Sequence, residues 1–159
     1  MIKTSYGILV FKRDRGNIYV LLAHPGGPFY QGKDLWTIPK GEPDGSEDNI
    51  TTAKREFREE TGVNIPGGEL IDLGSLAQSA VKINRIWAVH GNPDLTIFSS
   101  NEFELEWPPR SGKIQHFPEI DRIAWFTTDT ARMKLFPKQT GFIDRLESAL
   151  ASASADTIF

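Results

Sequence analysis

One stretch of the sequence, residues 41–63, constrains the chain more than any other. It begins with a glycine, has a glutamate at position 47, and continues from position 55 as Arg-Glu-Φ-x-Glu-Glu-x-Gly-Φ, where Φ is hydrophobic. Asp44 and Gly45 are a turn signal, Ser46 is a good N-cap, and Gly62 suits the left-handed residue that ends a helix. The pattern therefore predicts a turn followed by a helix of about fifteen residues.

The predicted helix places three carboxylates beside its buried stripe. At about 100° per residue, Ile50, Ala53 and Phe57 share a narrow arc, which is the predicted buried face. The glutamates that follow around one side of the helix are Glu56, Glu59 and Glu60. Neighbouring like charges on a helix cost about a few tenths of a kcal/mol per pair, so a shared cation would stabilise this rim.

Magnesium suits such a rim because it takes oxygen ligands and is normally shared between carboxylates and substrate phosphates. The loop before the helix can bring a backbone carbonyl to the same place, and Gly41 permits a close approach there. For an isolated E-x-x-E-E, a solvated charged face with scattered ion pairs is the usual interpretation. The complete spacing, with its glycines and its turn, favours a metal site instead.

The segment resembles the signature of the Nudix hydrolases at every specified position. The resemblance implies an α/β fold, namely an α/β/α sandwich with a mixed β-sheet between helices, and divalent-metal-dependent hydrolysis of a nucleoside diphosphate linked to another group. The implied ion is Mg²⁺, with Mn²⁺ as an alternative. By position, the family's metal-binding or base carboxylates are Glu56, Glu59 and Glu60. Gly41 corresponds to a backbone-carbonyl ligand, and Arg55 and Glu47 orient and support the cluster.

The residues before the signature offer candidates for substrate binding. The run from Trp36 to Gly41, W-x-x-P-K-G, resembles family members that cleave dinucleoside polyphosphates or other polyphosphates. Lys40 within it could neutralise phosphate charge or could be an ordinary solvated lysine. Tyr30 and Trp36 could stack on a nucleobase, because aromatic faces accept any base, or could close the core over the loop.

Three charged residues after the signature are further candidates. Arg85 falls on the apolar side of the strand predicted at 81–90 and needs an anionic partner, either a structural carboxylate or a substrate phosphate. Lys113 ends a loop, 108–113, that is either a mobile clamp or a solubilising loop. Glu119 is either an additional metal ligand or general base, or a surface acid. The predicted catalytic set is Glu59, Glu60, Arg55 and Glu119, with Glu59 as the first candidate for the general base and Glu119 as the second.

Length and composition limit the domain organisation and the classes of function that are possible. The 159 residues suit one domain, 1–159, in which 152–159 are expected to be a frayed tail. The net charge of −3 argues against a bulk electrostatic grip on nucleic acid, and the absence of cysteine excludes thiolate chemistry. We find no DNA-binding domain, no long apolar run for a membrane and no signal peptide, so the expected location is cytoplasmic. The oligomeric state cannot be read from one sequence.

The remaining patterns predict alternating strands and helices. The predicted extended segments are 5–12, 18–23, 35–38, 70–77, 81–90, 96–99, 101–107 and 123–126. Two further helices are predicted at 128–135, capped by Thr128 or Asp129, and at 139–151. The functional prediction is Mg²⁺-dependent hydrolysis of a phosphoanhydride in a small-molecule nucleotide, either a dinucleoside polyphosphate or a nucleoside triphosphate. The alternative is a non-catalytic nucleotide-binding sensor on the same fold.

Overall fold

The computed structural model describes residues 1–156, with side chains through Ala153. Its strands are β1 (Lys3–Asp14), β2 (Asn17–Pro25), β3 (Lys40–Gly41), β4 (Ile71–Ser79), β5 (Lys82–His90), β6 (Glu102–Glu106), β7 (Ile114–Pro118) and β8 (Ile120–Thr127). Its helices are α1 (Asn49–Thr61), α2 (Thr128–Lys134) and α3 (Thr140–Asp156), with short 3₁₀ turns η1 (Leu95–Ile97) and η2 (Pro137–Gln139). The central sheet has the order β4-β5-β1-β2-β8, and β3 pairs with β1. Because β1 and β5 run parallel while the other neighbours run antiparallel, the sheet is mixed, as predicted.

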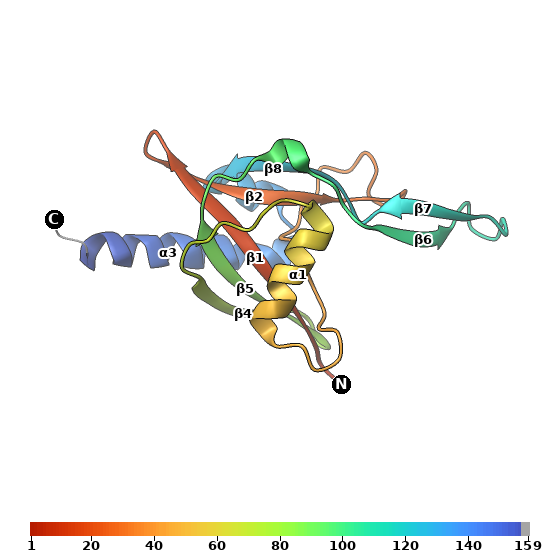
Figure 1. Cartoon of the computed structure of the whole chain (residues 1–159), viewed down its shortest axis with the longest axis horizontal. Coiled ribbons are helices and arrows are strands. Elements are labelled where there is room, and N and C mark those ends of the chain that lie inside the picture. The colour runs from red at the N-terminus through yellow and green to blue at the C-terminus, as the bar shows by residue number, and fades with distance from the viewer. Residues whose placement is uncertain (157–159) are drawn as a thin grey trace.

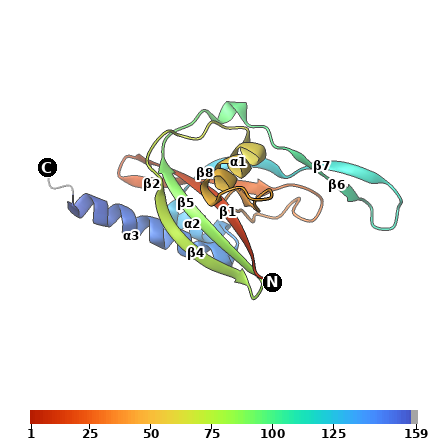
Figure 2. The same cartoon turned by 60° about the horizontal axis from the view of Figure 1, so that its bottom comes forward.

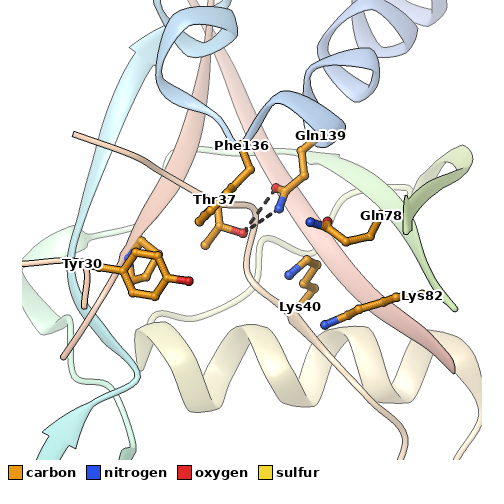
Figure 3. A pocket seen from close by; sticks show the side chains of 8 residues that line it. Tyr30, Thr37, Lys40, Gln78, Lys82, Phe136 and Gln139 are labelled. Carbon is orange, nitrogen blue, oxygen red and sulfur yellow. Dashed lines mark hydrogen bonds between the residues drawn. The ribbon is translucent and has the colours of Figure 1, made fainter. Parts of the chain in front are cut away.

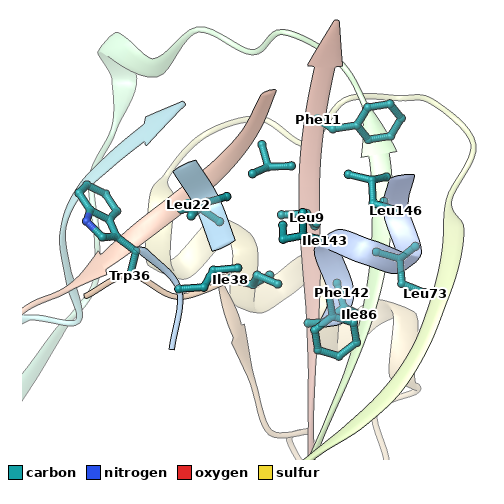
Figure 4. Packing of buried hydrophobic residues seen from close by; sticks show 14 of the residues in the cluster. Leu9, Phe11, Leu22, Trp36, Ile38, Leu73, Ile86, Phe142, Ile143 and Leu146 are labelled. Carbon is teal, nitrogen blue, oxygen red and sulfur yellow. The ribbon is translucent and has the colours of Figure 1, made fainter. Parts of the chain in front are cut away.

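Helix α1 covers one face of the sheet, and α3 with α2 covers the other (Figures 1 and 2). Alternate side chains of β1 point to opposite faces of the sheet. Ile8 and Val10 belong to the hydrophobic cluster beneath α1, whereas Leu9 and Phe11 belong to the hydrophobic cluster beneath α3. Figure 4 shows Leu9 and Phe11 beside side chains of α3. A strand covered on both faces is apolar without interruption, which explains the run 7–11. The predicted α/β/α sandwich is confirmed.

Helix α1 begins later than the sequence suggested. The cap is Asp48, whose side chain accepts a hydrogen bond from the Thr51 N–H at 2.8 Å, and Ser46 does not cap. The reason is that the Glu47 N–H closes a turn onto the Asp44 carbonyl at 3.1 Å, so residues 44–47 are used by the turn. Ile50 then lies in the first turn and is 39% exposed, which corrects the predicted buried face. The buried residues of α1 are Thr52, Ala53, Phe57, Glu60 and Thr61.

Other boundaries differ for local reasons. The segment predicted as extended at 96–99 instead contains η1, because the Asp94 side chain caps the Thr96 N–H and closes a 3₁₀ turn. The predicted strand at 35–38 makes only isolated bridges in the described chain, and Pro39 after it has no N–H to continue a ladder. Helix α2 is capped by Thr127, one residue before the earliest predicted cap.

The C-terminal helix α3 also differs from the prediction. It runs to Asp156, five residues beyond the predicted end at Ala151, and residues 157–159 of the expected tail lie outside the described part of the chain. No helix in residues 1–156 combines the length and the apolar character needed to cross a membrane.

Strands β6 and β7 form a separate two-stranded arm (Figures 1 and 2). The loop after β2 contacts the outer end of this arm, where the rings of Phe29 and Trp107 lie with centroids at 5.4 Å. The three glutamates of β6 are exposed, as the alternating sequence predicted; they are Glu102, Glu104 and Glu106.

The end of α1 gives a stability prediction. Gly62 has φ of 65°, and a Cβ added there would lie 2.7 Å from the Ser99 carbonyl oxygen. We expect Gly62→Ala to lower the free energy of unfolding by about 1–2 kcal/mol or more, because an L residue is disfavoured in this backbone region. Urea denaturation measures the change. The matched control is Gly67→Ala, where an added Cβ meets nothing within 4 Å, and an equal loss in both variants would contradict the assignment.

Candidate functional site

The site forms where α1 faces β3. Gly41 pairs with Tyr6 of β1, which fixes the loop backbone against the helix. A Cβ added to Gly41 would lie 2.1 Å from the carboxyl carbon of Glu56, so only glycine lets this carboxylate approach the main chain. The structure thus brings Gly41 and Glu56 together, as the sequence predicted for the metal rim.

Arg55 organises the acidic residues around it. Its Nε donates to both Glu47 carboxylate oxygens at 3.0 and 3.1 Å, and its Nη2 donates to the Glu42 carbonyl at 2.9 Å. Its Nη1 donates to Glu56 at 2.9 Å and to Glu59 at 3.0 Å. One guanidinium therefore hydrogen-bonds to three carboxylates and forms a longer ion pair with Asp44 at 3.6 Å, and the supporting role implied by the family resemblance stays a prediction.

Glu47 completes this arrangement from the helix N-terminal side. Besides Arg55, its carboxylate accepts hydrogen bonds from the Thr52 hydroxyl at 2.8 Å and the Asp44 N–H at 3.2 Å. The hydrogen bonds from Arg55, followed by that from Thr52, lower the pKa of Glu47 to about 2. Glu47 is thus held charged, and it anchors the turn to the helix.

Glu60 is the buried member of the cluster. It is 9% exposed, and its Oε2 accepts a hydrogen bond from the Lys40 N–H at 3.1 Å. Burial raises the pKa of Glu60 to about 9, with the charge of Lys40 opposing this rise and that of Glu56 adding to it. Burial likewise raises the pKa of Glu56, and Arg55 opposes that rise. Both carboxyl groups therefore hold a proton more readily than an ordinary glutamate, and a bound cation would favour their charged forms.

Glu59 and Glu119 flank the buried pair. The Glu59 side chain is 41% exposed and is tethered through Arg55. Glu119 lies between β7 and β8, where its N–H donates to Asn101 and its carbonyl accepts from Gly26. Loss of water raises the pKa of Glu119, and the nearby charge of Glu56 raises it further. Glu119 is thus close enough to Glu56 to sense its charge, and its role as a metal ligand or general base stays a prediction.

The oxygen ligands fit a hard divalent ion in their chemistry. Carboxylates and a main-chain carbonyl are the donors that Mg²⁺ takes, and a cation beside Glu60 would offset the burial that disfavours its charged form. Among residues 1–156, no three acidic or histidine side chains converge closely enough to hold an ion as they stand. Arg55 engages Glu56 and Glu59 in this arrangement. The residues that would hold the ion are Gly41, Glu56, Glu59 and Glu60.

A pocket of about 230 Å³ adjoins the buried end of the cluster. Lys40 connects the two, because its side chain lines the pocket while its N–H binds Glu60. Figure 3 shows Tyr30 and Phe136 on one side of the pocket and Lys40, Lys82 and Gln78 on the other. Burial lowers the pKa of Lys40, and the neighbouring Lys82 lowers it further.

The structure does not bring three of the predicted substrate-binding residues to this pocket. Trp36 is 4% exposed and packs against Phe126 with ring centroids at 4.8 Å, so no free face remains for a base. Arg85 pairs with Asp72 at 2.7 Å, which makes its partner a structural carboxylate. Lys113 is exposed in the loop that joins β6 and β7, at the tip of the arm that extends away from α1 in both views (Figures 1 and 2).

Sequence reasoning missed part of the pocket. The sequence contains a signal for Lys82, because strand alternation places its side chain on the opposite face of β5 from that of Arg85. Phe136 and Gln139 had none, since they reach the pocket from the segment before α3, about a hundred residues from Lys40 along the chain.

Comparisons with known proteins agree with this geometry. A family model described as the NUDIX domain matches residues 1–146. A Caenorhabditis elegans Ap4A hydrolase in a binary complex has 21% identity and a TM-score of 0.68, covering 93% of this chain and 98% of that one. A mutT/nudix family protein from Listeria innocua has 18% identity and a TM-score of 0.66, covering 98% of both chains.

A third structure holds a ligand. The NUDIX domain of Shewanella oneidensis NrtR, complexed with ADP ribose, has 16% identity and a TM-score of 0.61, covering 94% of this chain and 89% of that one. No curated protein sequence matches the chain significantly. At these identities the solved structures establish the fold, and the family model establishes membership. The chain therefore belongs to the Nudix family of phosphoanhydride hydrolases.

Proposed function

We propose that the chain catalyses Mg²⁺-dependent hydrolysis of a phosphoanhydride bond in a dinucleoside polyphosphate or a nucleoside triphosphate. The observation that carries this proposal is the continuity between the carboxylate cluster and a pocket with two lysines, joined through Lys40. The cluster supplies oxygen ligands for a divalent ion, and the lysines supply charge for phosphates. The C. elegans Ap4A hydrolase, whose fold this chain shares, supports the same class of substrate.

The two ends of the pocket suit different parts of a nucleotide substrate. Tyr30 and Phe136 form an aromatic wall, with ring centroids at 6.0 Å, that suits stacking on a nucleobase. Lys40 and Lys82 at the other end suit the phosphates. The pocket is about 230 Å³, below the range of roughly 300–1,000 Å³ typical for sites that enclose a whole ligand. We therefore expect it to hold one nucleotide end while the rest of the substrate lies over the carboxylates.

Catalysis requires a divalent ion, which neutralises phosphate charge and lowers the pKa of water when bound. Glu56, Glu59 and Glu60, with the Gly41 carbonyl, are the residues proposed to hold it. Arg55 orients Glu56 and Glu59 through the hydrogen bonds of its Nη1. Glu59 is our first candidate for the general base, because its carboxylate lies at the exposed rim where water has access. Glu119 is the second candidate, since its carboxyl is near Glu56 and forms no ion pair in the described chain.

The cellular location and the alternative function are predicted from the sequence. A cytoplasmic location remains a prediction. The pattern also allows a non-catalytic nucleotide sensor, but the presence of all three helix glutamates, two of them hydrogen-bonded to Arg55, supports catalysis.

Hydrolysis of a substrate panel tests the proposal. The protein is incubated with Mg²⁺ and diadenosine tetraphosphate, ATP, ADP-ribose or NADH, and the products are separated by anion-exchange chromatography. We expect turnover of diadenosine tetraphosphate or ATP that EDTA abolishes and Mg²⁺ restores. Nucleotide binding without turnover of any compound would instead support the sensor.

Removal of the proposed base gives a quantitative prediction. We expect Glu59→Gln to lower kcat by about 10²–10⁴-fold, because proton transfer by a positioned side chain contributes that much. The melting temperature should stay near that of the wild type, since Glu59 is at the exposed rim. Glu119→Gln is made in parallel. If Glu59→Gln retains near-normal turnover while Glu119→Gln loses it, the base is Glu119.

The role of Arg55 gives a second prediction. Arg55→Lys keeps the positive charge but cannot reproduce the forked contacts to Glu47, Glu56 and Glu59. We expect metal affinity or kcat to fall by about 10–100-fold, as is usual when a residue that orients metal ligands is changed. Mn²⁺ titration followed by EPR measures the affinity. Arg58→Lys on the exposed side of the same helix is the control, and similar losses in both variants would contradict the assigned role.

A further inference from the structure

Two amide side chains at the lysine end of the pocket, one buried and one partly buried, are hydrogen-bonded to each other. Asn84 of β5 is 1% exposed, and its Nδ2 donates a hydrogen bond to the Oε1 of Gln78 in β4 at 2.8 Å. The Asn84 Oδ1 is buried and has no hydrogen-bond partner in the described part of the chain. An unpaired buried acceptor lowers stability, and an apolar side chain of similar size would avoid that cost. We therefore attribute the presence of an amide side chain at position 84 to its hydrogen bond with Gln78.

The pair fixes the direction of the Gln78 amide. Because the Oε1 of Gln78 accepts from Asn84, its NH₂ group remains for the pocket, and Figure 3 shows this nitrogen turned toward Gln139 and Thr37. The amide of Gln139 is fixed in a similar way. Its Oε1 accepts from the Ile38 N–H at 2.9 Å, and its Nε2 donates to the Thr37 hydroxyl at 3.0 Å.

This end of the pocket consequently presents hydrogen-bond donors. Gln78 contributes its amide NH₂, and Lys40 and Lys82 contribute ammonium groups. None of the described residues that line the pocket carries a carboxylate. A cavity wall with donors and positive charge, without an anionic side chain, is complementary to an anion such as a phosphate.

Two of these donors, Gln78 and Lys82, lie apart from the carboxylate cluster. Lys40 is in β3, directly beside Glu60. Gln78 and Lys82 come from the ends of β4 and β5, which lie on the opposite side of β1 from β3. Because neighbouring strands are about 4.8 Å apart, a phosphate that reaches Gln78 and Lys82 is displaced from one that lies over Glu56 and Glu60.

We propose that Gln78, held in place by Asn84, is a specificity-determining donor for a phosphate group beyond the two of the cleaved linkage. This inference rests on the proposed function of the same site and makes it more specific. Gln78 contacts the additional phosphate together with Lys82, and Asn84 is a positioning residue that acts through Gln78. The selected substrates are those with three or more linked phosphates, in preference to a diphosphate joined to a sugar.

The test compares anions and substrates of different phosphate length. Binding of inorganic tripolyphosphate and of pyrophosphate is measured by calorimetry with Mg²⁺, and kcat/KM is measured for diadenosine tetraphosphate, ATP and ADP-ribose. The main variant is Gln78→Glu, which keeps the acceptor for Asn84 and replaces the amide NH₂ by a charged oxygen. Asn92→Asp makes the same chemical change at an exposed position outside the pocket and is the matched control.

We expect the wild type to bind tripolyphosphate more tightly than pyrophosphate. In Gln78→Glu, tripolyphosphate affinity and kcat/KM for the longer substrates should fall by about tenfold or more, through KM, because like charges then face each other. Pyrophosphate affinity and ADP-ribose hydrolysis should stay within about twofold, since the scissile diphosphate lies elsewhere. Asn84→Leu should retain or raise the melting temperature and still reduce the preference for tripolyphosphate, a combination that a purely structural role of Asn84 does not produce.

Other results would overturn the inference. Equal losses for tripolyphosphate and pyrophosphate in Gln78→Glu, no loss at all, or a wild type without preference between the two anions would each do so. The proposed function can fail separately. If the wild type hydrolyses none of the substrates, that function is wrong, while the binding measurements still decide whether Gln78 recognises the additional phosphate. If Asn84→Leu does not fold, Gln78→Glu alone decides.

Discussion

The contact between α1 and β3 buries two neighbouring carboxyl groups, those of Glu56 and Glu60, and the rest of the site depends on it. Gly41 lies so close to the carboxyl group of Glu56 that no side chain fits between them. Glu60 is buried behind Glu56, where its charged form is disfavoured. Arg55 forms ion pairs with Glu47, Glu56 and Glu59 and none with Glu60. Folding energy alone does not favour such an arrangement, so we interpret it as a binding site for a cation.

The sheet determines where this cation site can meet a substrate. β1 is buried on both faces and pairs with β3 on one side and β5 on the other. Lys40 therefore reaches the α3 side of the sheet while its N–H remains bonded to Glu60 on the α1 side. Lys82 and Asn84 arrive from β5 on the same side as Lys40. The two halves of the site thus come from opposite layers and meet at a two-residue strand.

The sequence predicted the part of the site that is local in the chain. Residues 41–63 are continuous, and helix periodicity suffices to bring their glutamates together. The apolar run of β1 and the alternation of β5 likewise predicted strands of the central sheet. The features of the site that the sequence did not predict depend on packing between segments that are distant in the chain. Trp36 resembles a stacking residue in its motif, yet the contacts with Phe126 and His24 place it in the core. Phe136 reaches the pocket through tertiary structure that no local pattern encodes.

A crystal structure with Mn²⁺ and a non-hydrolysable diadenosine tetraphosphate analogue tests the central claim most directly. Anomalous scattering locates Mn²⁺ independently of any assumption about its ligands. Our account predicts anomalous peaks bonded to oxygens of Glu56 and Glu60 and to the Gly41 carbonyl, beside the phosphates of the analogue. If the analogue binds with the ions elsewhere, or if the α1 carboxylates remain paired with Arg55 and hold no ion, the account is contradicted.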